Sequence, residues 1–216
     1  MEGLEEGLTL AREYARKAFG EGRAPPSHGY DHVVRVVGLC RWISRELGME
    51  RRERLMVEVA AWLHDVSIAI TGSKDGHASK SARVAERLLS GVVERPFLEI
   101  IVRAIEEHGW KVRRSPSSMV SAVLQDADRL DALGSIGIFR VIGYGVSSGR
   151  VFYDLEDPFA ERRALNDEVY TVDHFYVKLF ELPKYMNTEV ARKEAYRRIE
   201  VMKSFLEELR RELSLT

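Results

Sequence analysis

Apolar residues recur at intervals of three to four positions along most of the chain, with charged and polar residues between them. This spacing is typical of amphipathic helices, whose period is about 3.6 residues. Within residues 30–47, for example, Val33, Val36, Val37 and Cys40 form one apolar stripe. The strict alternation that marks a strand does not extend over any segment, and no internal repeat occurs. The pattern therefore predicts an all-α fold, a single-domain helical bundle.

Glycine, proline and polar residues separate the predicted helices from one another. The helices are expected over about residues 4–19, 30–47, 50–68, 77–89, 96–108, 117–133, 136–145, 169–182 and 188–213. Residues 109–118 are expected to form a loop, and the longest irregular segment follows Ser147. No change in composition marks a linker between domains. We therefore expect one domain over residues 1–216, with the C-terminal helices, about residues 169–214, packed as an appendage.

Charge and cysteine content narrow the class of protein. The chain has 33 basic and 34 acidic residues and a formal net charge of −1, so it lacks the strong field that attracts nucleic acids or membranes. The single cysteine, Cys40, excludes an internal disulfide and a cysteine-rich metal site. The N-terminal segment has no signal-peptide pattern, and no apolar run approaches the roughly 20 residues that span a bilayer. These features favour a cytoplasmic protein that binds neither nucleic-acid polymers nor membranes.

One apolar run contains two polar side chains that suggest chemistry. The run "AAWLHDVSIAI", residues 60–70, places His64 and Asp65 side by side. A carboxylate is costly to bury unless it is paired, hydrogen-bonded or bound to a metal ion. The pair could therefore satisfy itself within the core, or it could provide metal ligands at the bottom of a pocket.

Other histidines and aspartates favour the metal interpretation. Several of the six histidines fall near predicted helix ends, where helical bundles assemble metal sites. The segment "LQDADRLDALG" places Asp126, Asp128 and Asp131 in an otherwise apolar helix, where three acids repel one another unless a cation compensates. Two imidazoles and two carboxylates suit an ion such as Mn²⁺, Fe²⁺, Co²⁺, Ni²⁺ or Zn²⁺. The candidate donors are His32, His64, Asp65 and one of these aspartates.

Such a donor set indicates hydrolysis. Four protein ligands on an ion that prefers six leave positions for water and substrate, and a bound water readily becomes a hydroxide nucleophile. The ordered motifs "HGYDHVVRV", "AAWLHDV" and "LQDADRLDALG" resemble the H…HD…D signature of the HD-domain metal-dependent phosphohydrolase superfamily. The resemblance extends over nearly the whole chain and is to the small stand-alone HD hydrolases. It implies the helical HD fold.

The resemblance also implies roles for individual residues and a class of substrate. The implied metal ligands are His32, His64, Asp65 and Asp128, which would hold one divalent ion (Mn, Ni, Co, Fe, Mg or Zn) and leave room for a second. Either Asp126 or Asp131 would orient a ligand or serve the fold. Members of the superfamily cleave phosphate mono-, di- or pyrophosphate bonds, mostly of nucleotides. We therefore expect a metal-dependent phosphohydrolase that takes a small phosphorylated substrate, a nucleotide.

The chain departs from the superfamily in the segment after the doublet. This segment reads "VSIAI" and lacks the catalytic glutamate of some HD nucleotidases. Candidates for catalysis are Asp65, His77, Lys80 and His108, and candidates for phosphate binding are Lys80, His108 and Arg129. A non-catalytic sensor of metal and nucleotide, and a di-metal oxygenase on the same scaffold, remain as alternatives. The segment after Ser147 is expected to close over the pocket or to meet another subunit of a homo-oligomer.

Overall fold

The computed structural model describes residues 1–109 and 115–215, and the chain divides into two compact units, Met1–Asp128 and Arg129–Thr216. The division falls inside helix α7 (Met119–Asp131). Helices account for most of the described residues, and none of these residues belongs to an extended strand. The all-α prediction is therefore confirmed. That the two units form a single domain stays a prediction.

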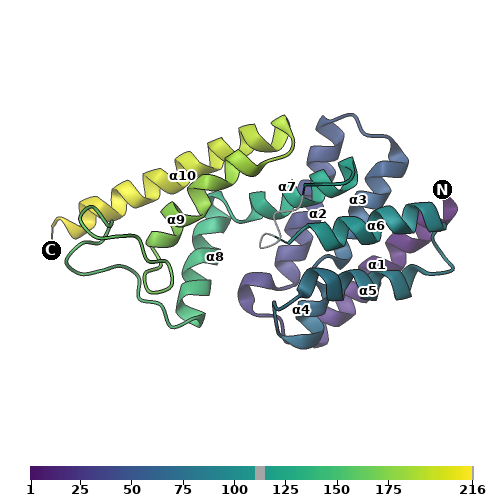
Figure 1. The fold of residues 1–216 in the computed structure, drawn as a ribbon, viewed down its shortest axis with the longest axis horizontal. Coiled ribbons are helices and arrows are strands. Elements are labelled where there is room, and N and C mark those ends of the chain that lie inside the picture. Colours follow the sequence, from purple (N-terminus) through teal and green to yellow (C-terminus); the bar gives the residue numbers. More distant parts are fainter. Residues whose placement is uncertain (110–114, 216) are drawn as a thin grey trace. The chain divides into compact units, whose positions relative to one another are not determined.

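The first unit is a helical bundle, drawn from purple to teal in Figure 1. Before α7 it contains α1 (Glu2–Glu21), η1 (Pro26–His28), α2 (Tyr30–Glu46), α3 (Arg51–Leu63), α4 (Val66–Thr71), α5 (His77–Leu89) and α6 (Arg95–Glu107). Helix α3 packs against α1, α2, α5 and α6, so residues 59–63 are buried on every side. The loop expected over residues 109–118 lies partly outside the described residues.

The helix expected over residues 50–68 is broken at the pair His64 and Asp65. Helix α3 ends at Leu63, and Asp65 departs from helical geometry with φ −111° and ψ 10° before α4 begins at Val66. The prediction of one continuous helix was wrong, because the apolar run continues through two buried helices and the periodicity does not reveal the break. In a continuous helix the two side chains would point about 100° apart. The break brings His64 Nε2 within 3.7 Å of Asp65 Oδ2.

The second unit contains the end of α7, α8 (Gly134–Ser147), α9 (Asp173–Val177), η3 (Leu179–Tyr185) and α10 (Glu189–Leu213). Helix α10 packs against α8 and η3. The helix expected over residues 169–182 is instead divided into α9 and the 3₁₀ helix η3. Pro183 lies inside η3, where it lacks the amide that a continuous α-helix needs and restricts the preceding residue. An isolated β-bridge joins Val151 to Tyr170.

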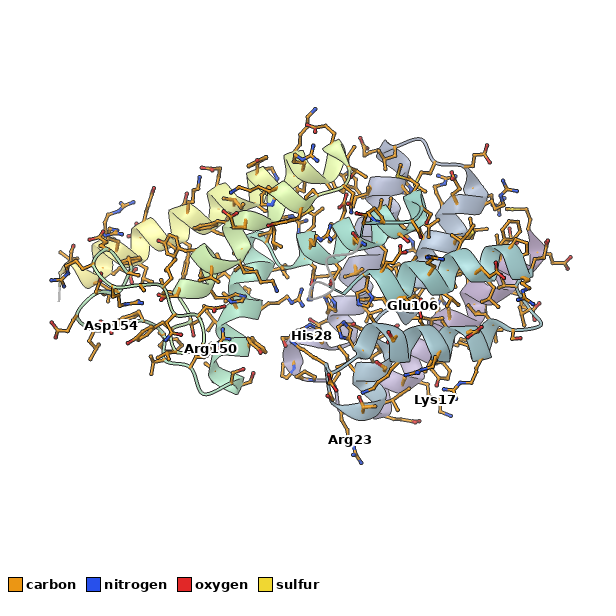
Figure 2. All side chains as sticks on the ribbon, in the orientation of Figure 1. Lys17, Arg23, His28, Glu106, Arg150 and Asp154 are labelled. Carbon is orange, nitrogen blue, oxygen red and sulfur yellow. The ribbon has the colours of Figure 1, made fainter. Side chains whose placement is uncertain are left out.

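Carboxylates fix the irregular segment between α8 and α9. Asp157 accepts hydrogen bonds from the main-chain amides of residues 161–163 at 2.8 to 3.0 Å. Asp154, labelled in Figure 2, accepts two amides of the turn that follows it. Asp173 is completely buried and binds two guanidinium nitrogens of Arg163 at 2.6 and 2.8 Å. The segment thus has a defined structure without being helical.

The described residues include no single helix that is both long enough and apolar enough to cross a bilayer. Helices α7 and α8 meet those criteria of length and composition only when they are counted together across the break between them. The cytoplasmic location stays a prediction.

Two glycines of α8 provide a matched test of packing in the second unit. A Cβ atom at Gly145 would lie 2.3 Å from Thr171 Oγ1 and 3.0 Å from Thr171 Cγ2, whereas one at Gly143 would meet no described atom within 4 Å. We expect Gly143→Ala to raise the free energy of unfolding by about 0.5–1 kcal/mol. Gly145→Ala should lower it by about 1–3 kcal/mol, because the buried threonine must move. Thermal unfolding measures both changes, and equal effects of the two substitutions would contradict the packing described.

Candidate metal centre

Six histidine and aspartate side chains of the first unit gather around the break between α3 and α4. They come from the first turn of α2 (His32), the end of α3 (His64), the break itself (Asp65), the first residue of α5 (His77), the residue after α6 (His108) and the last turn of α7 (Asp128). Helix ends therefore converge on one place, which is where helical bundles build metal sites.

Asp65 lies at the centre of this cluster and is 2% exposed. Its Oδ2 atom lies 3.6 Å from His32 Nε2 and 3.7 Å from His64 Nε2. Its Oδ1 atom lies 3.4 Å from His108 Nε2 and 3.6 Å from His77 Nε2. Within the described part of the chain, Oδ1 has no hydrogen-bond partner. A buried carboxylate oxygen that no donor satisfies is costly, and a cation would remove that cost.

The donor atoms form two overlapping groups of metal-binding size. In each group the atoms lie within 4.8 Å of one another; the groups are His32, His64 and Asp128, and His64, Asp65 and His108. His32 Nε2 lies 3.3 Å from His64 Nε2 and 3.5 Å from Asp128 Oδ1. The arrangement thus fits the mixed nitrogen and oxygen ligands that divalent transition metals take.

Main-chain carbonyls set the orientation of three imidazoles. Nδ1 of His64, of His77 and of His108 lies 2.7, 2.8 and 2.6 Å from the carbonyl oxygen three residues earlier. Because a carbonyl only accepts, Nδ1 carries the proton in each ring and Nε2 of the neutral ring keeps its lone pair. In all three rings Nε2 is the nitrogen nearest to Asp65. When neutral, each of these rings therefore presents the lone pair of Nε2 toward Asp65, as a metal ligand would.

Charge within the cluster sets the protonation states. Burial lowers the pKa of His64 to about 4, so this imidazole is neutral at neutral pH. Burial raises the pKa of the Asp65 carboxyl, but His64 and His108 outweigh burial and hold that pKa well below its usual range. In the same way, His32 and His64 outweigh burial and lower the pKa of Asp128. Burial lowers the pKa of His108, but the Asp65 carboxylate reverses that effect and raises it. Ionised carboxylates and a neutral His64 are the states that metal ligation requires.

Solvent reaches the cluster at two of its members. The side chain of Asp128 is 26% exposed and that of His77 is 25% exposed, whereas that of Asp65 is 3% exposed. The neighbouring rings of His32, His64 and His108 are buried. Within the first unit, water and a small ligand would therefore approach the buried donors from the side of Asp128 and His77.

Comparisons with known proteins identify the family. The family model described as "HD domain" matches residues 29–133, which include all six members of the cluster. The uncharacterized protein YpgQ of Bacillus subtilis is 30% identical over 189 residues, which is 86% of this chain and 84% of YpgQ. The chain belongs to the HD superfamily. The matched residues include the pair His64 and Asp65, which is called the HD doublet below.

Solved structures of similar proteins share the HD fold. A protein of Lactobacillus plantarum is 31% identical, with a TM-score of 0.75 and 98% of each chain covered. An HD-superfamily hydrolase of Bacillus thuringiensis is 30% identical, with a TM-score of 0.69 and with 99% of this chain and 97% of that one covered. The structure of B. subtilis YpgQ in complex with ADP has a TM-score of 0.72 at 24% identity, with 97% of this chain and 96% of that one covered.

Two residues expected to bind phosphate make other contacts. Lys80 Nζ donates a hydrogen bond to the main-chain oxygen of Asp75 at 2.7 Å, beside the start of α5. Arg129 belongs to the second unit, where its guanidinium donates to the main-chain oxygen of Tyr185 at 2.6 Å. Their roles toward phosphate stay predictions.

The other two aspartates of α7 differ in their surroundings. Asp131 is buried in the second unit and accepts a hydrogen bond from Arg140 at 2.9 Å, which favours a structural role. Asp126 is buried in the first unit. That Asp126 orients a ligand or a water stays a prediction.

One further histidine, His28, lies next to the six side chains of the cluster, beside His32. The ring of His28, labelled in Figure 2, lies 5.4 Å from that of His32, centroid to centroid. From His32 the contacts run through His64 and His108 to His77, with centroids 5.1 to 5.3 Å apart. His28 precedes His32 by four residues, but it ends η1 and lies outside α2, so the spacing along one helix does not explain this contact.

Proposed function

We propose that this HD protein is a metal-dependent phosphohydrolase that cleaves a phosphate ester or pyrophosphate bond of a nucleotide with a metal-activated water. The observation that carries the proposal is Asp65 Oδ1, a buried and unsatisfied oxygen within 3.4 to 3.6 Å of two imidazoles. The relatives support the substrate class, since one of them is named an HD-superfamily hydrolase and another was solved with ADP.

The proposed ligands of the ion are His32, His64, Asp65 and Asp128, whose donor atoms suit Mn²⁺, Ni²⁺, Co²⁺, Fe²⁺, Mg²⁺ or Zn²⁺. A bound ion would lower the pKa of a water and polarise a phosphoryl oxygen. Asp128, the more exposed of the two carboxylates, lies on the side from which a nucleotide phosphate would enter.

Basic groups around the ligands would neutralise the charge of the phosphoryl oxygens. His77 and Lys80 lie in the first turn of α5, and His77 is partly open to solvent. The raised pKa of His108 favours its protonated form, which donates to an anionic oxygen. Arg129 stays a candidate from the sequence alone, since its guanidinium donates to the main-chain oxygen of Tyr185 within the second unit. We assign to His77, Lys80 and His108 the stabilisation of the charge that develops on phosphate during hydrolysis.

The second donor group supports one alternative function. His64, Asp65 and His108 are near enough to one another to hold a second ion, and His77 Nε2 lies 3.6 Å from the same carboxylate. Two irons at these positions would allow a di-metal oxygenase. Metal content per chain and oxygen consumption separate this alternative from hydrolysis.

A release assay tests the proposed function. Wild-type protein and Asp65→Ala are incubated with nucleoside mono-, di- and triphosphates in the presence of Mn²⁺, Ni²⁺, Co²⁺, Mg²⁺ or Zn²⁺, and phosphate and pyrophosphate are measured. Release by the wild type alone supports a hydrolase. Binding of Mn²⁺ and ADP without release from any nucleotide would instead identify a sensor and overturn the proposal.

The affinity for Mn²⁺ should rise with pH. A protonated His108 places positive charge beside Asp65 and opposes a cation, so binding should strengthen as the pH rises through the raised pKa of His108. His64, with a pKa of about 4, is already neutral over this range and contributes no change. Calorimetric titration with Mn²⁺ between about pH 5.5 and 8 measures the trend. His108→Ala should flatten the profile, and an unchanged profile in that variant would contradict the assignment.

A further inference from the structure

Hydrogen bonds of two buried serines connect α4 to the beginning of α5. The main-chain amide of Ser67 donates to Ser81 Oγ at 3.1 Å, and Ser67 Oγ donates to the main-chain oxygen of His77 at 2.9 Å. Ser67 is 2% exposed and Ser81 is completely buried. His77 and Ser81 are four residues apart and so lie on the same face of α5. The two hydrogen bonds therefore attach α4 to the face of α5 that carries His77.

This attachment is short and begins next to the HD doublet. Asp65 immediately precedes α4, and Ser67 is the second residue of that helix. The amide of Ser67 is one of the first-turn donors that have no partner within their own helix, and Ser81 accepts from it. Figure 1 shows α4 next to α5, and the two helices pack against each other.

Apart from the two serine hydrogen bonds, Asp65 and His77 are connected through the polypeptide chain between them. It passes through residues 72–76, a polar segment that begins and ends with glycine in the left-handed conformation. These residues are exposed, whereas both serines are buried. The loop also contributes, since the carbonyl of Lys74 holds Nδ1 of His77 at 2.8 Å. The carbonyl orients the ring, and the serines fix the place of the helix that carries it.

We propose that Ser67 and Ser81 are positioning residues that hold the imidazole of His77 at Asp65 Oδ1. The proposal rests on the proposed function, in which His77 acts on the phosphoryl group. The relevant distance is the 3.6 Å between His77 Nε2 and Asp65 Oδ1. Loss of either hydroxyl releases the first turn of α5 from α4, and His77 then no longer faces the carboxylate in one fixed position.

A double-mutant cycle tests the coupling between Ser67 and His77. Ser67→Ala should lower kcat for phosphate or pyrophosphate release from ATP and ADP with Mn²⁺ by about 10-fold or more, because small displacements of a catalytic group are costly. The same substitution should have no further effect in a His77→Ala background. Equal losses in both backgrounds would mean that the serine serves only the fold, and would overturn the proposal. Ser81→Ala should follow the same pattern.

Ser44→Ala is the matched control. Ser44 is also buried, and its hydroxyl donates to a main-chain carbonyl, that of Arg41, at 3.2 Å. Both groups lie in α2, away from the attachment between α4 and α5. The control should lose a hydrogen bond of the same type and keep the kcat of the wild type.

A spectroscopic measurement tests the proposal without turnover. Protein with ¹⁵N-labelled histidine is examined by NMR with Zn²⁺, and His77→Ala identifies the signals of His77. Ser67→Ala should shift or broaden these signals, and Ser44→Ala should not. Unchanged His77 signals in Ser67→Ala would overturn the positioning role, whatever the activity. Shifted signals in a protein that hydrolyses no nucleotide would support the positioning role and reject the proposed function alone.

Discussion

Replacement of Asp65 by asparagine is expected to remove bound Mn²⁺ and to reduce nucleotide hydrolysis to background. The side chain keeps its shape but loses the charge around which four imidazole nitrogens gather at 3.4 to 3.7 Å. The affinity for Mn²⁺ should fall by more than about 100-fold, because groups that merely orient a ligand already contribute about 10–100-fold. Metal analysis and phosphate release measure the two effects.

Asp75→Asn provides the control for this variant. Asp75 also carries a carboxylate in the first unit, but it is exposed in the loop before α5. It should keep the metal content and activity of the wild type, and circular dichroism should show both variants folded. A full complement of Mn²⁺ in Asp65→Asn would show that this carboxylate is not a ligand.

Replacement of Asp173 by asparagine should be the most destabilising single change in the second unit. The carboxylate of Asp173 is completely buried, binds two nitrogens of Arg163 and accepts the amide of Asn166 at 2.7 Å. Removing one partner of a buried ion pair leaves the other charge uncompensated and costs about 3–5 kcal/mol. Thermal unfolding should register this loss. Hydrogen exchange should show faster opening of the irregular segment that Arg163 supports.

Glu181→Gln is the corresponding control at the surface. Glu181 pairs with Lys184 at 2.7 Å, but both side chains are largely exposed. Such pairs contribute about 0–1 kcal/mol. If Asp173→Asn cost no more than Glu181→Gln, the buried pair would not be what holds the irregular segment.

The bounds of a helix could be predicted closely where glycine, proline or polar residues mark its ends. Breaks between helices were missed where no such residues mark them. Helix α5 runs from His77 to Leu89 as expected, because a polar glycine-rich loop precedes it and Gly91 follows it. At the HD doublet, burial on both sides of the break removes the contrast between faces on which periodicity depends. The short helices α9 and η3 were predicted as one helix because nothing in the sequence marks the break at Lys178, and Pro183 comes only later, inside η3.

The candidate site could be predicted as a set of residues but not as an arrangement. The structure brings together the residues that the resemblance implied as ligands, His32, His64, Asp65 and Asp128. The approach of His77 and His108 to Asp65 Oδ1 depends on how α5 and α6 pack against α3 and each other, and no local pattern encodes that. Nothing in the sequence indicated a role for Ser67 or Ser81, because serine is common in helices, caps and loops alike.

Main-chain carbonyls orient three of the imidazoles. We therefore expect metal binding to tolerate substitutions at the residues that supply those carbonyls. Ala61, Lys74 and Ile105 contribute only their backbone oxygen to His64, His77 and His108, respectively. Any residue except one that distorts the local backbone offers the same acceptor there. Saturation mutagenesis should therefore find these three positions permissive for metal binding, limited only by packing. If side chains had held these imidazoles instead, a substitution at any of three further positions could have removed the acceptor that orients a histidine.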